Sequence, residues 1–260
     1  YLEIGLWHEA ERSDGLTMET LPAEIDSAEA EVNAASGRRA PLFVLPNHGD
    51  HAYTKIALDN VSLAFARERL PEIADPLSRQ ISWRALWDMV RDQQLSSLDY
   101  LEIVSRHLSV EHDVALVETL LATAQGAIAR YVPNRQKSAA AHAFFKRAWK
   151  LLPGLPVGDL QILWARTLIQ NALTPEDIKH TGRLADGELE VSGLAIDQEM
   201  RWEIAARYTA YGLEGAEDRA AAESVRDPSD RGQRALLRIE TSTPDLTVKA
   251  AAWERLLGEG

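Results

Sequence analysis

His8 and Glu9 stand side by side near the start of the chain and resemble the opening of the zinc-protease motif His-Glu-x-x-His. On a helix, two histidines four residues apart share one face and bind zinc, and the glutamate acts as a general base. Position 12, where the second histidine would stand, is Arg12. The surrounding residues alternate between apolar and polar types, which predicts a strand, and on a strand such positions do not converge. We therefore predict that the motif is absent and that His8 is an exposed strand residue.

The densest group of possible metal ligands is His48-Gly49-Asp50-His51. Two histidines and one aspartate in a loop could bind a metal ion adventitiously, but no fourth ligand stands nearby. Residues of these types also gather in turns for backbone reasons, and this explanation is favoured. We assign no catalytic, cofactor-binding or metal-binding residue to this chain. An unrecognised hydrolase that uses His48, Asp50 and His51 is the least favoured alternative.

The other side chains with possible chemistry are scattered along the sequence. The sequence holds no nucleophile elbow, dinucleotide-binding turn or Walker loop, and without cysteine it can have no thiolate nucleophile. Four histidines are predicted to be surface or rim residues: His107, His112, His142 and His180. Two acidic groups are predicted to be solvated: Glu188 with Glu190, and Glu214 with Glu217 and Asp218. Five tryptophans lie in apolar helical stretches and are predicted to pack in the core: Trp83, Trp87, Trp149, Trp164 and Trp202.

The composition is that of an acidic globular protein. Forty acidic residues against 28 basic ones give a net charge of -12, which repels phosphate backbones and anionic lipids. Nucleic-acid and membrane partners are therefore not expected. No apolar run is long enough to span a bilayer and no signal segment is recognisable. With no disulfide possible, we expect a cytoplasmic protein.

The pattern of the sequence changes near residue 60. Before it, period-two alternation or short apolar runs predict strands at Leu2–Trp7, Leu16–Thr20, Leu42–Leu45 and Tyr53–Leu58. Four or five antiparallel strands of this length form at most part of a β-sandwich. We therefore predict a partial β-sandwich domain at residues 1–60.

From Val61 onward, helical spacing replaces the alternation; Ile81, Ala85 and Met89, for example, share one helix face. Further helices are expected at Ala139–Leu152, Asp159–Leu173, Ile196–Gly212, Gly215–Val225, Arg231–Glu240 and Leu246–Leu257. About ten helices with short connections predict an irregular HEAT-like α-solenoid of antiparallel helix pairs at residues 61–260. The predicted fold class is mainly α with a small β part.

Helix starts carry recognisable capping residues. Thr174 and Thr243 each precede a proline and are predicted to cap the helices that follow. Ser96 with Asp99 is a looser capping box, in which Asp replaces the usual Glu or Gln.

Several segments together resemble bacterial aminopeptidase N proteins, in particular their actinobacterial branch. Leu42–Asp59 is similar to the last strands of the small β-sandwich in that family, and Arg84–Asp92 to the opening helices of its C-terminal helical domain. Arg201–Arg207, Asp227–Gly232 and Lys249–Glu254 are similar to later parts of that domain. The segments occur in consistent order over nearly the whole chain.

The resemblance implies a longer parent enzyme, a zinc metallopeptidase with a thermolysin-like catalytic domain upstream, which releases N-terminal amino acids from peptides. The zinc, the catalytic residues and the Gly-rich motif would lie in that upstream part, so this chain would hold no cofactor and be inactive alone. Its partners would be the peptide substrate and the upstream catalytic domain, and the helical domain would cap the active-site chamber and be truncated at its C-terminus. The alternative is a free-standing helical-repeat scaffold that binds a protein partner. An upstream His-Glu-x-x-His in the same genomic reading frame would decide between them.

Overall fold

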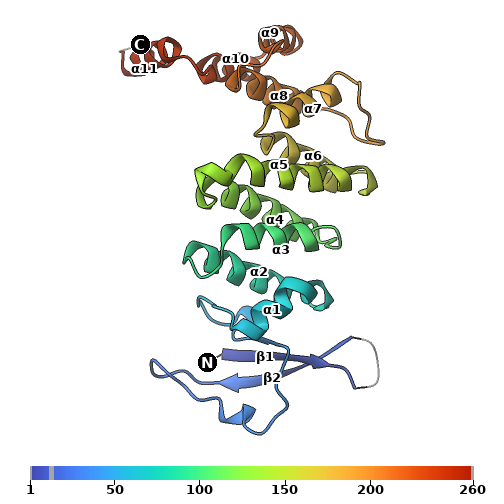
Figure 1. Cartoon of the computed structure of the whole chain (residues 1–260), viewed down its shortest axis with the longest axis vertical. Coiled ribbons are helices and arrows are strands. Elements are labelled where there is room, and N and C mark those ends of the chain that lie inside the picture. Colours follow the sequence, from blue (N-terminus) through green and yellow to red (C-terminus); the bar gives the residue numbers. More distant parts are fainter. Residues whose placement is uncertain (1, 12–14, 259–260) are drawn as a thin grey trace. The chain divides into compact units, whose positions relative to one another are not determined.

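The structure is a computed structural model that describes residues 2–11 and 15–258. The chain divides into two compact units, Tyr1–Pro133 and Asn134–Gly260, and each is described by itself. The described residues form eleven α-helices and one small sheet, which confirms the predicted fold class of mainly α with a small β part (Figure 1).

The sheet of the first unit has three antiparallel strands in the order β2-β1-β3. β1 (Leu2–Glu9) lies in the centre between β2 (Leu16–Ala23) and β3 (Phe43–Leu45). Trp7 is paired with Phe43, and their rings lie 5.4 Å apart. Phe43 in turn stacks on Phe65 of α1 at 5.2 Å, so aromatic packing joins this part of the sheet to the first helix.

The predicted strand at Tyr53–Leu58 is wrong, and the described residues hold three strands where four or five were expected. Ile56 and Leu58 are buried, and the Leu58 N–H points at the sulfur of Met89, 3.4 Å away. Ile56 and Leu58 thus lie on the side of this segment that packs on α2, and this packing explains why apolar and polar residues alternate. A neighbouring strand is not its cause, because no strand of the described chain pairs with it.

Four helices follow in the first unit: α1 (Asn60–Arg69), α2 (Pro76–Arg91), α3 (Ser97–His107) and α4 (Val114–Gly126). The first begins where Asp59 accepts hydrogen bonds from the backbone N–H groups of Val61 and Ser62. α2 packs on α3 and α3 on α4, while α1 also contacts α3 and α2 contacts α4. Contacts with both the next helix and the one after it are typical of stacked antiparallel helix pairs.

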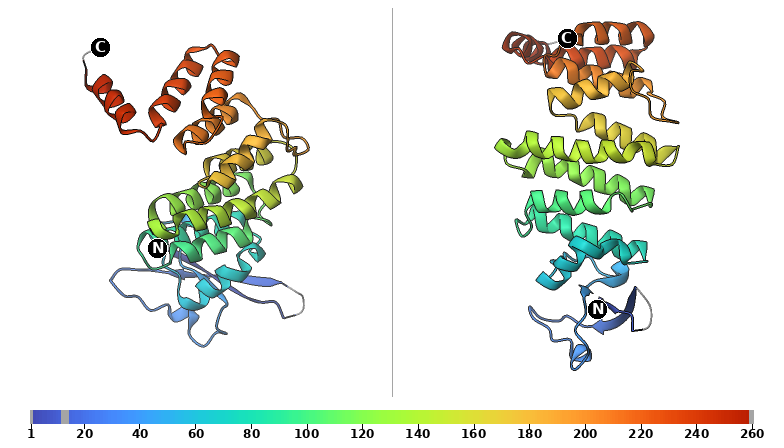
Figure 2. Two further views of the ribbon diagram at one scale, coloured as in Figure 1. Left: turned by 45° about the horizontal axis from the view of Figure 1, so that its top comes forward. Right: turned by 45° about the vertical axis from the view of Figure 1, so that its right-hand side comes forward.

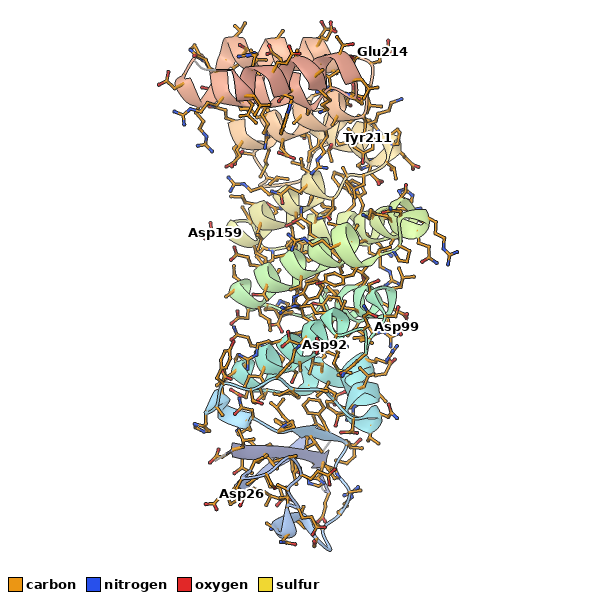
Figure 3. The ribbon with its side chains drawn as sticks, turned by 90° about the vertical axis from the view of Figure 1, so that its left-hand side faces the viewer. Asp26, Asp92, Asp99, Asp159, Tyr211 and Glu214 are labelled. Atoms are coloured by element: carbon orange, nitrogen blue, oxygen red, sulfur yellow. The ribbon has the colours of Figure 1, made fainter. Side chains whose placement is uncertain are left out.

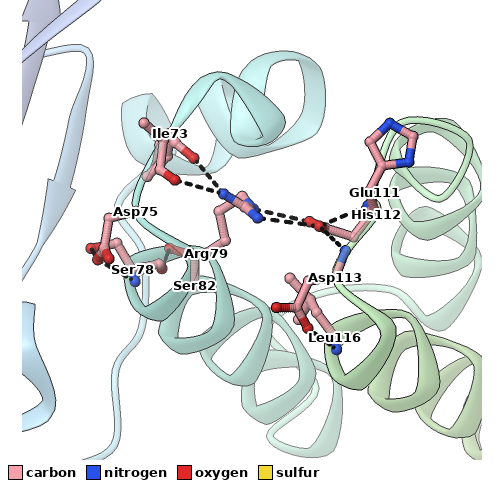
Figure 4. A network of polar contacts seen from close by, with 10 residues as sticks. Ile73, Asp75, Ser78, Arg79, Ser82, Glu111, His112, Asp113 and Leu116 are labelled. Carbon is pink, nitrogen blue, oxygen red and sulfur yellow. Dashed lines mark hydrogen bonds and ion pairs between the residues drawn. The ribbon is translucent and has the colours of Figure 1, made fainter.

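A buried ion pair fixes the beginning of α2 against the connection between α3 and α4 (Figure 4). The Arg79 guanidinium donates two hydrogen bonds to Glu111, of 2.9 and 3.2 Å, and two more to the carbonyls of Ile73 and Ala74. Glu111 also accepts from the backbone N–H groups of His112 and Asp113, both at 3.0 Å. The side chains of Arg79 and Glu111 are only 13% and 6% exposed. Each charge is therefore both neutralised and hydrogen-bonded inside the protein.

Seven helices make up the second unit: α5 (Asn134–Leu151), α6 (Asp159–Gln170), α7 (Pro175–Ala185), α8 (Gln198–Ala210), α9 (Ala216–Arg226), α10 (Asp230–Ser242) and α11 (Leu246–Leu257). Each packs on its successor, and α8 also contacts α6 and α10. Figure 2 shows the orange and red helices of this unit following one another in alternating directions. Trp202, Ala205, Ala220 and Ile239 form the buried core between α8, α9 and α10.

The second unit repeats the ion-pair arrangement of the first. The Nε–H of Arg201 donates one hydrogen bond that is shared by the two carboxylate oxygens of the buried Glu223 of α9, at 2.8 and 3.0 Å. Nη1 of Arg201 donates another to the carbonyl of Ile196. In both units the arginine stands four residues after an aspartate that caps its helix, Asp75 or Asp197.

The turns lie at the edges of each unit. In Figure 3, Asp92 and Asp99 mark the connection between α2 and α3, and Tyr211 and Glu214 the one between α8 and α9. Glu188, Glu190, Glu214, Glu217 and Asp218 are all exposed, as predicted.

The structure confirms two of the three predicted caps. Thr174 accepts from the N–H of Asp177 at the start of α7, and Ser96 accepts from two N–H groups at the start of α3. The Asp99 carboxylate binds Arg67. The prediction for Thr243 is wrong, because α11 begins two residues later and Asp245 caps it. A carboxylate that can reach two free N–H groups displaces the hydroxyl from this role.

Replacement of Glu111 by glutamine should lower the free energy of unfolding of the first unit by about 3 kcal/mol, because it leaves the Arg79 charge buried without a counter-ion. The matched control is Asp92→Asn, which breaks the exposed Lys55–Asp92 pair and should cost less than about 1 kcal/mol. Urea denaturation of both variants measures the difference. Equal losses would show that the Arg79–Glu111 pair does not hold the unit together.

The two threonines give a second matched pair. Thr174→Ala should lower the free energy of unfolding by about 1 kcal/mol, since it removes the cap of α7. Thr243→Ala should change it by less than about 0.5 kcal/mol, because Asp245 supplies the cap of α11. Thermal and urea denaturation monitored by far-UV circular dichroism test the order; a larger loss for Thr243→Ala would contradict it.

Candidate functional site

The structure places His8 and Glu9 on β1, which confirms that this segment is a strand. Glu9 pairs with Arg69, and this hydrogen bond lowers the pKa of the Glu9 carboxyl. His8 lies 3.3 Å from Glu19 and its side chain is 13% exposed, so the prediction of an exposed histidine is wrong: the neighbouring strand β2 covers it. Arg12, the residue at the position of the second motif histidine, lies outside the described residues.

The side chains of the loop His48–His51 diverge. His48 Nδ1 lies 3.1 Å from the Ser78 hydroxyl, Asp50 pairs with Arg84 at 2.8 Å, and His51 lies 3.5 Å from Glu3. The loop is closed by the side chain of Asn47, which binds the backbone of Ala52 through both its amide nitrogen and its oxygen. Turn chemistry thus organises this segment.

A search of the described residues finds no group of three or more His, Cys, Asp or Glu side chains arranged for a metal ion. The described part of the chain thus brings no set of side chains together that fits a zinc ion.

Three of the remaining histidines have close partners. His107 is buried, with Nε2 2.9 Å from the Ala66 carbonyl, so its prediction as a surface residue is wrong. Burial lowers the pKa of His107, since the charged form loses its hydration. His142 lies 2.7 Å from the buried Asp177, and the His180 ring packs edge-on against Trp149.

The tryptophans mostly pack as predicted. Trp83, Trp164 and Trp202 are buried, while Trp87 and Trp149 are half-buried.

A cleft of about 660 Å³ lies between α6, α8 and α10 of the second unit. Its floor is formed by apolar atoms of Ile169, Met200, Trp202 and Ala235. Its walls carry four arginines, Arg166, Arg231, Arg234 and Arg238, and three carboxylates, Asp197, Glu199 and Glu203. Four positive charges against three negative ones leave a local excess of +1 in a chain whose net charge is -12.

Three of the four arginines in the cleft form ion pairs with its carboxylates. Arg166 pairs with Asp197 at 2.9 Å, Arg231 lies 3.4 Å from Glu199, and Arg238 pairs with Glu203 at 2.9 Å. Arg234 is exposed and its side chain makes no hydrogen bond or ion pair with the described residues. It therefore has its donors free for an anionic group. The sequence analysis missed this cleft, although the spacing of Arg231, Arg234 and Arg238 places all three on one helix face.

Hydrogen bonds lower the pKa of two carboxyl groups at the cleft, those of Asp197 and Asp227. Burial opposes the charge of Asp197, but the Met200 N–H and the Arg166 guanidinium outweigh it and lower the pKa of the Asp197 carboxyl. Asp227 beneath the cleft accepts from Ser229 and from the Trp202 indole N–H, which lowers the pKa of the Asp227 carboxyl. Asp197 therefore contributes a negative charge to the cleft, and Asp227 contributes one beneath it.

Residues 43–260 match the family model of the ERAP1-like C-terminal domain. The chain belongs to this family. It is also 32% identical over 235 residues to aminopeptidase N of Streptomyces lividans. The alignment covers 90% of this chain and 27% of that protein, so the chain spans about a quarter of the length of the curated relative it matches. These matches confirm the resemblance to the C-terminal portion of aminopeptidase N.

Two of the segments that carry the resemblance in this ERAP1-like domain meet beneath the cleft. Trp202, in the segment Arg201–Arg207, donates to Asp227 in the segment Asp227–Gly232. A Cβ on Gly232 would lie 2.0 Å from the Asp227 carbonyl oxygen, so this position requires glycine. Among the helices of the described residues, none is long and apolar enough to span a bilayer.

Proposed function

We propose that this chain is a non-catalytic portion of a zinc-dependent aminopeptidase that releases N-terminal amino acids from peptides, and that its helical part caps the active-site chamber and shapes peptide access. The observation that carries the proposal is the family membership together with the 32% identity to a protein named aminopeptidase N. The zinc ion and the catalytic residues belong to an upstream domain, so no chemical step is assigned to the residues of this chain.

The same proposal sets the domains and partners. Residues 1–60 are part of a β-sandwich, and residues 61–260 belong to the helical domain. The first helix, α1, begins directly after its capping residue Asp59, and this boundary supports the division. The partners are the peptide substrate and the upstream catalytic domain of the same protein, and the compartment is the cytoplasm.

One side of α11 carries exposed apolar side chains. Leu246, Trp253 and Leu257 lie on one side of the helix and are 88%, 60% and 66% exposed. Inner helices of a stacked array bury such a stripe against the next helix.

The arginine-rich cleft is the surface best suited to meet the distal part of a peptide. A carboxylate on the peptide, from an acidic side chain or the chain end, would complete the partners of Arg234. Binding energy gained far from the scissile bond helps to position the substrate and to close an enzyme around it. A peptide too short to reach the cleft gains nothing from it.

The first test concerns the chain by itself. Purified in the presence of zinc, it should release no product from alanyl- or leucyl-anilide, because it lacks the zinc motif. The measurement is hydrolysis compared with a chelator-treated blank across the chromatographic peak. Activity that co-elutes with the protein would contradict the assignment of catalysis to another domain.

The second test uses the full-length enzyme and a series of peptide lengths. A ten-residue peptide reaches about 33 Å when extended, whereas an anilide occupies only the zinc site. Arg234→Glu should reduce kcat/KM for long peptides with acidic distal residues by roughly fivefold and leave the anilide unchanged. The reduction should shrink at high salt. Arg255→Glu is the matched control, since Arg255 is exposed on α11 and does not line the cleft. Equal changes for short and long substrates would mean that the cleft does not contact the peptide.

A further inference from the structure

A second hollow, in the first unit, lies between α2 and α4 and has a different chemistry. It measures about 210 Å³, and its floor is formed by Trp83, Tyr100 and Leu120, which are between 0% and 3% exposed. Trp87 forms one wall, with its ring 5.5 Å from that of Tyr100. We call this site the α2–α4 hollow.

The hydroxyl groups that line the α2–α4 hollow already have partners. The Tyr100 hydroxyl donates to the Thr123 hydroxyl at 2.7 Å, and Thr123 donates to the Thr119 carbonyl at 2.8 Å. A ligand at the floor therefore meets ring faces and edges, and it meets no hydroxyl group that lacks a partner. Such a lining favours an apolar group, and an aromatic ring in particular, because rings gain from edge-to-face contacts with their neighbours.

The rim of the hollow carries a different set of groups. Arg84 pairs with Asp50 across the mouth at 2.8 Å, and both remain partly exposed. Gln80 is exposed, and its amide makes no hydrogen bond with the described residues. A guanidinium at the mouth favours an aromatic ring over an aliphatic group. The amide of Gln80 and the carboxylate of Asp50 can bind the C=O and N–H groups of a peptide backbone.

We propose that the α2–α4 hollow binds one aromatic side chain carried on a polypeptide. The size agrees, because an apolar cavity of roughly 150 Å³ holds benzene, and this hollow has room for a substituted ring. The floor recognises the ring and the rim recognises the flanking amides. That the polypeptide is a substrate of an aminopeptidase rests on the proposed function, whereas binding of the ring does not.

The test uses this chain and N-acetyl-tyrosinamide, which carries one ring and two amide groups. Binding is followed through the indole N–H resonances of Trp83 and Trp87, assigned by replacing each with phenylalanine. The expected Kd is about 1 mM, as for other small ligands of this size. N-acetyl-alaninamide, which has the amides without the ring, should bind at least tenfold more weakly. Equal binding of the two probes, or no shift of either resonance, would overturn the proposal.

Variants that fill the α2–α4 hollow with a large side chain test whether the probe binds there. Thr119→Trp and Gln80→Trp place an indole over it from α4 and from α2, and each should weaken N-acetyl-tyrosinamide at least tenfold. Glu118→Trp is the matched control, since Glu118 is exposed on α4 and does not line the hollow. Two closures from opposite helices keep the test valid if one variant fails to fold. Unchanged Kd in a folded closure variant would place the probe elsewhere. These measurements involve no peptide hydrolysis, so they can fail while the proposed function stands, and the reverse.

Discussion

Two buried arginine–glutamate pairs fix the helices on which the rest of each unit is built. Arg79 joins the start of α2 to the connection before α4, and Arg201 joins the start of α8 to α9. A buried charge is tolerated only when it is paired and all its hydrogen-bonding atoms are satisfied. Each pair therefore permits one orientation of its helix, and apolar contacts fill the space around it. The arginines also bind the carbonyls before their own helices, so the turn and the helix are held as one piece.

Both hollows described above depend on these fixed helices. The arginine-rich cleft lies on α8, just beyond Arg201, and the α2–α4 hollow opens between the two elements that Arg79 and Glu111 hold together. Their chemistry differs because the residues on the facing helices differ. In the second unit, arginines of α10 face acids of α8. In the first unit, aromatic rings of α2 and α3 face Leu120 and two threonines of α4. A stacked helical array can thus present surfaces of different chemistry.

The charge of the chain and the charge of its cleft have opposite signs. A net charge of -12 disfavours phosphate backbones and anionic lipids over the molecule as a whole. Within the cleft, three carboxylates neutralise three of the four arginines, and Arg234 remains. At ordinary salt, dissolved ions screen the field of such a local charge beyond about 10 Å. The excess charge therefore acts only on groups that enter the cleft. This supports a role in the recognition of a bound peptide segment.

The sequence alone determined the helices of this protein and the point where they begin. Helical periodicity after residue 60, and hydroxyls such as Ser96 and Thr174 before helix starts, are local signals, and the structure confirms them. Local patterns gave a wrong prediction where contact with a residue far along the chain decides the structure. The alternation at Tyr53–Leu58 comes from contact with Met89, and His107 is buried because α1 lies against α3. Only the tertiary structure brought Glu111 to Arg79 and Glu223 to Arg201, across 32 and 22 residues, and left Arg234 without a carboxylate. Pairing of charges is a property of side chains that meet in space, and a sequence without its fold does not say which of forty acidic residues meets which base.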